Sequence, residues 1–234
     1  MTLPGTEMVA LPASGAECRV QWLRSSRARR VSLRICPRQA AVVVVLPPQA
    51  ARRTGLALLR ANGPWVLARL AGLAPANPLL DGGRVMLGGR DCTIRHDPAA
   101  VGTSLVDDQV VVGGAPEYLP GRVLDFLRAE AERRIGVLTA RHAATLEVKP
   151  GAIRLKDTRS RWGSCAPDGT LAFSWRLVMA PDWVLDYAVS HEVAHLREMN
   201  HSPRFWAHVS RLTPHRDAAA AWLRANGPTL LRVG

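Results

Sequence analysis

The chain has 234 residues, 47% of them hydrophobic, which is enough to bury the core of one large or two small domains. No apolar run approaches the roughly 20 residues of a membrane-spanning helix, and residues 1–18 lack the pattern of a secretion signal. We therefore expect no membrane partner and a cytoplasmic location. The formal net charge of +12 favours contact with polyanions, so nucleic acid is a candidate partner, although arginines are spread along the whole chain.

The first half of the chain predicts short strands with two helices between them. Residues 19–23, 30–35 and 41–46 have strand patterns, and we expect an antiparallel sheet. Residues 49–61 and 64–73 have helical spacing. Further short strands, separated by glycine and aspartate turn signals, are predicted at residues 84–87, 91–95, 103–106 and 109–112.

The second half predicts long helices, and the change of pattern near Gly113, Gly114 and Pro116 suggests a domain boundary. We expect an N-terminal β-rich domain over residues 1–115 and a C-terminal domain over residues 116–234, which makes the fold class α+β. The predicted elements of the C-terminal domain are a helix at 120–145, paired strands at 152–155 and 170–175, and helices at 181–199, 203–212 and 215–226.

The most informative motif is His191-Glu192-Val193-Ala194-His195, within the helix predicted at 181–199. Residues four apart lie on one helix face, so both imidazoles can reach one ion while Glu192 points to its open position. This spacing predicts a zinc site with Glu192 as a general base. The other reading is a pair of ordinary core or surface histidines beside an incidental glutamate.

A catalytic zinc ion usually has three protein ligands and an open fourth position. His201 is the leading third ligand, because six residues after His195 leave room for the helix to end near Met199 and for Asn200 to cap it in a left-handed conformation. Glu198 and His208 are the competitors. Zinc with a neighbouring carboxylate predicts hydrolysis of a peptide bond, and other amide hydrolysis or deamination fits the motif nearly as well.

Four cysteines, including Cys165, lack paired C-x-x-C spacing, so we expect reduced and mostly buried thiols. Cys165 follows Arg161, Trp162 and Ser164, and a nucleophilic role is the minor alternative for its thiol. Arg161, Trp162, Ser164 and Tyr187 are candidates for lining the cleft or contacting an oxyanion. Packing in the core is the competing role for Trp162, and equally for Phe205 and Trp206.

Several segments together resemble the signature of the bacterial YgjP-like metallopeptidases. They are residues 159–165 (Arg-Ser-Arg-Trp-Gly-Ser-Cys), Trp175-Arg176-Leu177, residues 191–196, and Asn200-His201-Ser202 followed by Phe205-Trp206. The resemblance covers the C-terminal half densely, and the leading strands and helices look like the family's less distinctive N-terminal region.

The resemblance implies a zincin-like domain related to the SprT-like and Spartan proteases, which cut proteins attached to DNA. It also implies His191, His195 and His201 as zinc ligands and Glu192 as the catalytic base. The metzincin pattern has glycine three residues after the second histidine, where this chain has Glu198, so its turn to the third ligand must differ. The sequence therefore predicts a zinc peptidase with a protein or peptide substrate. The alternative is a zinc-stabilised, non-catalytic nucleic-acid-binding module. The oligomeric state is not predicted.

Overall fold

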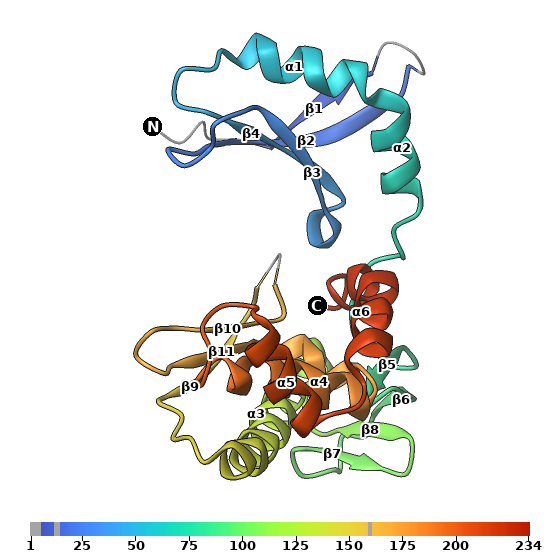
Figure 1. Ribbon diagram of the computed structural model, residues 1–234. Helices are drawn as coiled ribbons and strands as arrows, with labels where there is room; N and C mark the ends of the chain where they lie inside the picture. The colour runs from blue at the N-terminus through green and yellow to red at the C-terminus, as the bar shows by residue number, and fades with distance from the viewer. Residues whose placement is uncertain (1–5, 12–14, 159–160) are drawn as a thin grey trace. The chain divides into compact units, whose positions relative to one another are not determined.

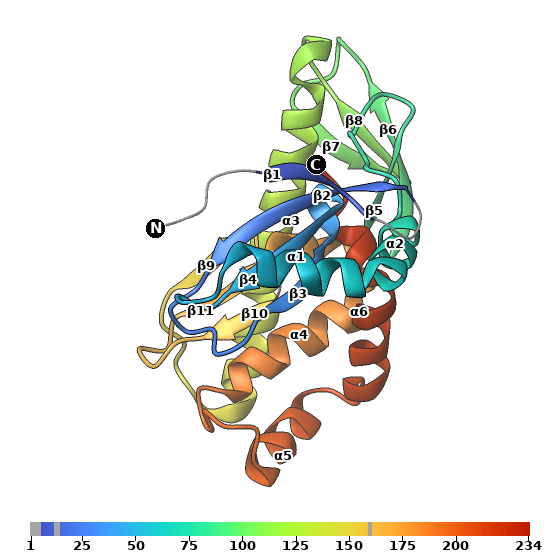
Figure 2. The same ribbon diagram turned by 90° about the horizontal axis from the view of Figure 1, so that it is seen from above.

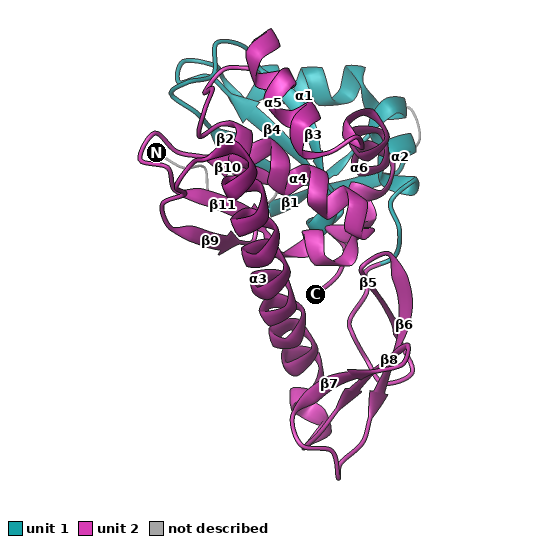
Figure 3. Cartoon of the chain, turned by 60° about the horizontal axis from the view of Figure 1, so that its bottom comes forward, with its two compact units in different colours: residues 1–75 teal, residues 76–234 magenta. Residues whose placement is uncertain are grey.

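A computed structural model describes residues 6–11, 15–158 and 161–234 (Figure 1). The chain forms two compact units, unit 1 over residues 1–75 and unit 2 over residues 76–234 (Figure 3). Each unit has its own buried hydrophobic cluster. Strands and helices are mixed in both units, so the predicted α+β class is confirmed.

Unit 1 is one four-stranded sheet with two helices packed on one face. Val20, Trp22, Val42 and Val44 point to these helices and form the buried cluster with Leu59. Gly55 is needed in the first helix because a Cβ there would lie 2.7 Å from the Trp22 ring. The elements are β1 (Thr6–Ala10), β2 (Glu17–Arg24), β3 (Ser32–Cys36), the 3-10 helix η1 (Pro37–Gln39), β4 (Ala41–Leu46), α1 (Arg52–Ala61) and α2 (Gly63–Ala71).

The prediction of an antiparallel sheet in this N-terminal region is wrong in one pairing. The strand order is β1-β2-β4-β3, in which β2 and β4 are parallel neighbours and the other pairs are antiparallel. The central position of β4 explains the difference. Its Ala-Val-Val-Val-Val-Leu sequence is buried at five of six positions, which suits a strand with neighbours on both sides.

Unit 2 begins with a second four-stranded sheet that repeats this arrangement. Its order is β5-β6-β8-β7, again with the parallel pair in the middle, a likeness that the sequence did not reveal. The strands are β5 (Arg84–Leu87), β6 (Arg90–His96), β7 (Thr103–Val106) and β8 (Gln109–Val112). Val85, Ile94 and Val110 belong to the same buried cluster as the C-terminal helices. The compact units therefore divide after Pro75, whereas the sequence placed the boundary after residue 115.

The long helix α3 (Leu119–Leu146) follows the 3-10 helix η2 (Pro116–Tyr118) and contacts both sheets of unit 2 (Figure 3). The second of these sheets has the order β10-β11-β9, from β9 (Ile153–Lys156), β10 (Gly163–Cys165) and β11 (Leu171–Ser174). The strands β9 and β11 pair, as predicted, and the structure shows that this pairing is parallel. The short edge strand β10, which pairs antiparallel with β11, was not predicted.

Three helices complete unit 2 after the 3-10 helix η3 (Trp175–Met179): α4 (Asp182–Ala194), α5 (Pro203–Leu212) and α6 (Arg216–Leu230). The helices α4 and α6 lie side by side (Figures 1 and 2). Among the described residues, no helix combines the length and the apolar character that crossing a membrane requires.

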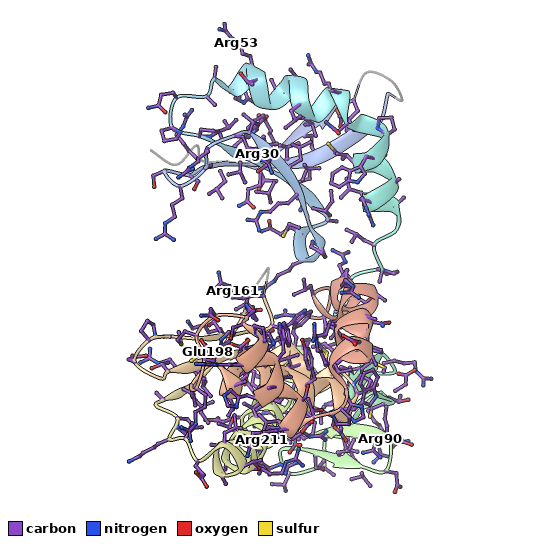
Figure 4. All side chains as sticks on the ribbon, viewed as in Figure 1. Arg30, Arg53, Arg90, Arg161, Glu198 and Arg211 are labelled. Atoms are coloured by element: carbon purple, nitrogen blue, oxygen red, sulfur yellow. The ribbon has the colours of Figure 1, made fainter. Side chains whose placement is uncertain are left out.

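The two units differ sharply in charge. Residues 1–75 contain eleven arginines and two glutamates, with no lysine or aspartate, for a formal charge of +9. Residues 76–234 contain twenty basic and seventeen acidic side chains, for a charge of +3. In unit 1, Arg53 projects from α1 into solvent (Figure 4). Most of the net positive charge therefore lies in the smaller unit.

Candidate metal centre

Helix α4 carries His191, Glu192 and His195 on a rigid support. It is buried on most of its surface, and Leu185, Val189 and Val193 pack into the core of unit 2. The histidines are one turn apart, so their rings lie on the same side, with centroids 5.1 Å apart. The buried part of the helix fixes the direction of both imidazoles.

The chain leaves α4 earlier than the sequence predicted. The helix ends at Ala194 with His195 as its C-cap, and Asn200 is not in the left-handed conformation expected of it. The segment after the cap is hydrogen-bonded to the C-terminal end of α3. The Arg197 guanidinium donates to the carbonyl oxygens of Leu146 and Glu147 at 2.6–3.0 Å. This contact between distant segments ends the helix before Met199.

His201 is brought back to the first two histidines by the start of α5. The Asn200 side chain accepts a hydrogen bond from the Ser202 amide, and Ser202 caps α5 by accepting one from the Phe205 amide. The ligand atoms of His191, His195 and His201 all lie within 4.8 Å of one another. The Nε2 atoms of His201 and His191 are 3.1 Å apart.

The 3.1 Å between the Nε2 atoms of His201 and His191 is close to the spacing of two ligands on a tetrahedral zinc ion. Two nitrogens that each lie about 2.0–2.1 Å from one tetrahedral zinc ion are about 3.4 Å apart. The His195 Nδ1 atom lies 3.1 Å from the Glu198 carbonyl oxygen, which can only accept, so the proton is on Nδ1 and the Nε2 lone pair is free to bind a metal. The three imidazoles are therefore of a donor type that binds divalent metals, and together they could hold a metal ion.

The two competing ligands lie outside this group. The Glu198 carboxylate is not part of the histidine cluster, and Glu198 contributes its backbone carbonyl to His195 instead. His208 is also outside the cluster, with its Nδ1 buried and without a hydrogen-bond partner among the described residues. The geometry thus favours His201 as the third metal-binding side chain.

Aromatic side chains of α5 support the three imidazoles. The fully buried Phe205 ring lies 4.4–4.9 Å from the centroids of all three. The Trp206 ring stacks on the His201 ring with centroids 5.6 Å apart. The Arg216 guanidinium lies over the Trp206 ring, 3.7 Å from its centroid. Phe205 is thus both a core residue and a neighbour of the site, two roles that the sequence had presented as alternatives.

Glu192 lies against the edge strand β10. A Cβ atom on Gly163 would be 2.5 Å from both Cγ and Oε1 of Glu192, so only glycine leaves room for this carboxylate. Gly227 has the same role for Trp162, since a Cβ there would lie 2.7 Å from its ring. The Arg161-Trp162-Gly163 segment is therefore held between α4 and α6.

Burial sets the protonation of the site. It raises the pKa of Glu192 to about 7, with the positive charge of Arg161 acting in the opposite direction. Burial, then the neighbouring histidines, lower the pKa of His191 to about 4, and burial also lowers the pKa of His195. Neutral imidazole is the form that binds metals, and a carboxyl group with a pKa near 7 can both accept and return a proton.

Two cavities meet at Glu192. One, of about 380 Å³, is bordered by the three histidines, Arg161 and Ser164. The other, of about 510 Å³, is bordered by Arg161, Trp162 and Tyr187 together with residues of α6. All four predicted cleft residues therefore line a cavity beside Glu192, while residues 159 and 160 of the predicted signature lie outside the described part of the chain.

Cys165 borders the cavity of the histidines but is poorly suited to be a nucleophile. Burial raises the pKa of its thiol, and the negative charges of Glu192 and Asp168 add to the shift. Both effects disfavour the thiolate. The other three cysteines are buried, as predicted.

Sequence reasoning missed several residues that shape the site. Gly163 lies within the signature at residues 159–165, but its role, like that of Arg197, depends on contacts with segments far away in the chain. On α6, Ala220, Leu223 and Gly227 are spaced by three and four residues, which is a visible helical face. That spacing identified a helix but not the cavity the face borders.

Comparison with known proteins assigns the family. Residues 29–226 match the family described as "YgjP-like, metallopeptidase domain". The chain belongs to this YgjP-like family. The resemblance seen in the sequence is thereby confirmed, and membership of a metallopeptidase family implies a metal ion, which the histidine cluster could hold.

The YgjP-like chain is also similar to one solved structure, the crystal structure of the metallopeptidase zymogen of Pyrococcus abyssi abylysin. The alignment covers 40% of this chain and 92% of that chain, with 20% sequence identity and a TM-score of 0.35. No curated protein matches the YgjP-like chain.

Proposed function

We propose that this chain is a zinc-dependent peptidase in which His191, His195 and His201 hold the metal and Glu192 is the general base. The observation that carries the proposal is the convergence of three imidazoles beside a buried carboxylate that faces a cavity. Membership of a metallopeptidase family supports hydrolysis of peptide bonds over deamination or other amide hydrolysis.

A zinc ion bound here would polarise the scissile carbonyl group and lower the pKa of water toward 7. The Glu192 carboxylate accepts the proton of the attacking water and returns it to the leaving amine. Gly163 keeps this carboxylate in place, and the Arg161 guanidinium favours its ionised form. The backbone of β10 and the Ser164 side chain border the same cavity and can contact the substrate.

A Glu192→Gln variant tests the mechanism. It should retain one zinc ion per chain by metal analysis and lose peptidase activity about 10²- to 10⁴-fold, because the amide cannot accept the proton. The exposed Glu132 of α3 provides a matched control, and Glu132→Gln should keep both metal and activity. A Glu192→Gln protein as active as the parent would exclude Glu192 as the base.

The ligand assignment has its own test. His201→Ala should reduce the zinc content, whereas His208→Ala should leave one zinc ion per chain. The reverse result would identify His208 as the third ligand. A protein that refuses zinc altogether would overturn the proposal.

A second proposal concerns unit 1, which we infer contacts nucleic acid. The supporting observations are its charge of +9 and its exposed arginines. Arg19 and Arg34 lie on the sheet face that α1 and α2 leave uncovered, and the loop between β2 and β3 contains Arg27, Arg29 and Arg30. Arg19 and Arg34 share this face because they alternate with Val20 and Ile35, which pack toward the helices. If nucleic acid binds while no substrate is ever cut, the non-catalytic alternative replaces the peptidase. The cytoplasmic location stays a prediction.

A further inference from the structure

The larger of the two cavities at Glu192 is mainly apolar. Its walls come from the segment before β10, from α4 and from α6, and it encloses about 510 Å³. Its apolar walls include Trp162, Ala188, Ala220, Leu223, Pro228 and Leu231. Arg161 and Arg224 are the charged side chains beside them, apart from His191 and Glu192 at the inner end.

Small residues on facing helices create this space. Ala188 on α4 and Ala220 on α6 both border the cavity, and neither side chain extends beyond Cβ. At Gly227 the Trp162 ring approaches the helix so closely that a Cβ atom would lie 2.7 Å from it. The indole therefore forms a wall on the α6 backbone, and the alanines keep the interior open.

The cavity is connected to the proposed chemistry by shared residues. Arg161, His191 and Glu192 border both this cavity and the smaller one that contains all three histidines. A peptide whose scissile bond lies beside Glu192 therefore has an apolar cavity within reach of a side chain next to that bond. Binding cavities of this size, mostly apolar with a few polar groups, are typical of specificity sites.

We propose that this cavity selects a large apolar side chain, aromatic or long aliphatic, adjacent to the cleaved peptide bond. The inference rests on the proposed peptidase function and adds its substrate class. Burying such a side chain favours phenylalanine or leucine over alanine by about 10- to 100-fold in kcat/KM. Lysine and arginine are disfavoured, because Arg161 and Arg224 repel a second positive charge in a partly desolvated space.

The test uses the full zinc-loaded protein and a peptide series that differs only beside the scissile bond, with phenylalanine, leucine, alanine or lysine there. The expected order of kcat/KM is phenylalanine and leucine, then alanine, then lysine. Ala220→Trp fills the cavity and should remove the preference for phenylalanine over alanine, with Ala220→Leu as the milder variant if the tryptophan disturbs folding. Ala218→Trp, on the exposed side of α6, is the matched control and should keep the preference.

Binding of N-acetylphenylalanine amide and N-acetylalanine amide, followed by NMR, gives a readout that needs no cleavage. We expect preferential binding of the phenylalanine amide, which Ala220→Trp should lose and Ala218→Trp should keep. This result supports the cavity inference even if no peptide is cut, and in that case only the peptidase proposal fails. Cleavage without preference for apolar side chains, or a preference unchanged in Ala220→Trp and Ala220→Leu, overturns the cavity inference and leaves the peptidase proposal standing. Equal binding of both amides overturns it as well.

Discussion

The two units contain four-stranded sheets with the same strand order and the same parallel central pair, yet they differ in what surrounds the sheet. In unit 1 the sheet supports two helices, and eleven of the thirteen charged side chains of this unit are arginines. In unit 2 the sheet shares a core with the helix that carries His191, Glu192 and His195. The comparison teaches that one strand order is compatible with very different surroundings. The role that we propose for each unit therefore rests on the side chains around its sheet and not on the strand order.

The largest expected effect is a loss of nucleic-acid affinity when the positive charge of unit 1 is removed. Replacing five exposed arginines of unit 1 with glutamine should remove most of the affinity for nucleic acid. The slope of log affinity against log salt should become shallower by about 0.9 for each phosphate that the variant no longer neutralises. Peptidase activity on a free peptide should not change. The arginines are Arg19, Arg27, Arg29, Arg30 and Arg34.

A salt titration by fluorescence anisotropy measures this effect. The matched control replaces five exposed arginines of unit 2 and should lower the affinity much less. The control positions are Arg90, Arg128, Arg133, Arg154 and Arg204. Equal losses in both variants would mean that the charge of unit 1 has no special role.

The second effect tests whether the two cores are independent. Phe205→Ala should lower the free energy of unfolding of unit 2 by about 3–5 kcal/mol, and Leu59→Ala that of unit 1 by about 2–5 kcal/mol, because both side chains are fully buried in separate clusters. Calorimetry should resolve two transitions, each moved by one variant. A single transition that both variants lower equally would contradict the division into two units.

A smaller effect is expected at Gly163. Gly163→Ala should displace the Glu192 side chain from β10 and reduce kcat by about 10²-fold with the zinc content unchanged. Gly136, inside α3, has open space at its Cβ position, so Gly136→Ala should keep full activity and stabilise unit 2 by about 0.5–1 kcal/mol. Full activity in Gly163→Ala would show that Glu192 does not need this contact.

The smallest effect is a loss of stability in acid. Burial alone would raise the pKa of Asp186. Hydrogen bonds from His142, 2.9 Å away, and from Thr213 outweigh burial, as do the charges of His142 and Arg141, so the pKa of this carboxyl group lies below its usual value. A lowered pKa stabilises the fold above the unfolded value of about 3.9, and this stabilisation disappears as the pH falls through the folded pKa. Asp186→Asn should therefore cost about 1–3 kcal/mol at neutral pH and flatten the decline below about pH 4 in urea unfolding. An unchanged acid profile would contradict this role.

Local sequence patterns predicted most of the elements. Strands at residues 84–87, 103–106 and 109–112 were predicted with the observed bounds, and α5 likewise. The parallel pairings of β2 with β4 and β6 with β8 were not predicted, because hydrophobic alternation identifies a strand but not its neighbours. The edge strands β1 and β10 were missed because their five and three residues are too few to show a clear alternation.

The sequence by itself determined that His191, Glu192 and His195 share one end of a helix, because helix geometry relates residues within one turn. Only the tertiary structure decided where that helix ends, because Arg197 binds the C-terminal end of α3. It also decided that His201 joins the histidine cluster while Glu198 and His208 do not. It alone decided the cavity between α4 and α6. These features depend on contacts between residues far apart in the chain, and no short-range spacing specifies such contacts.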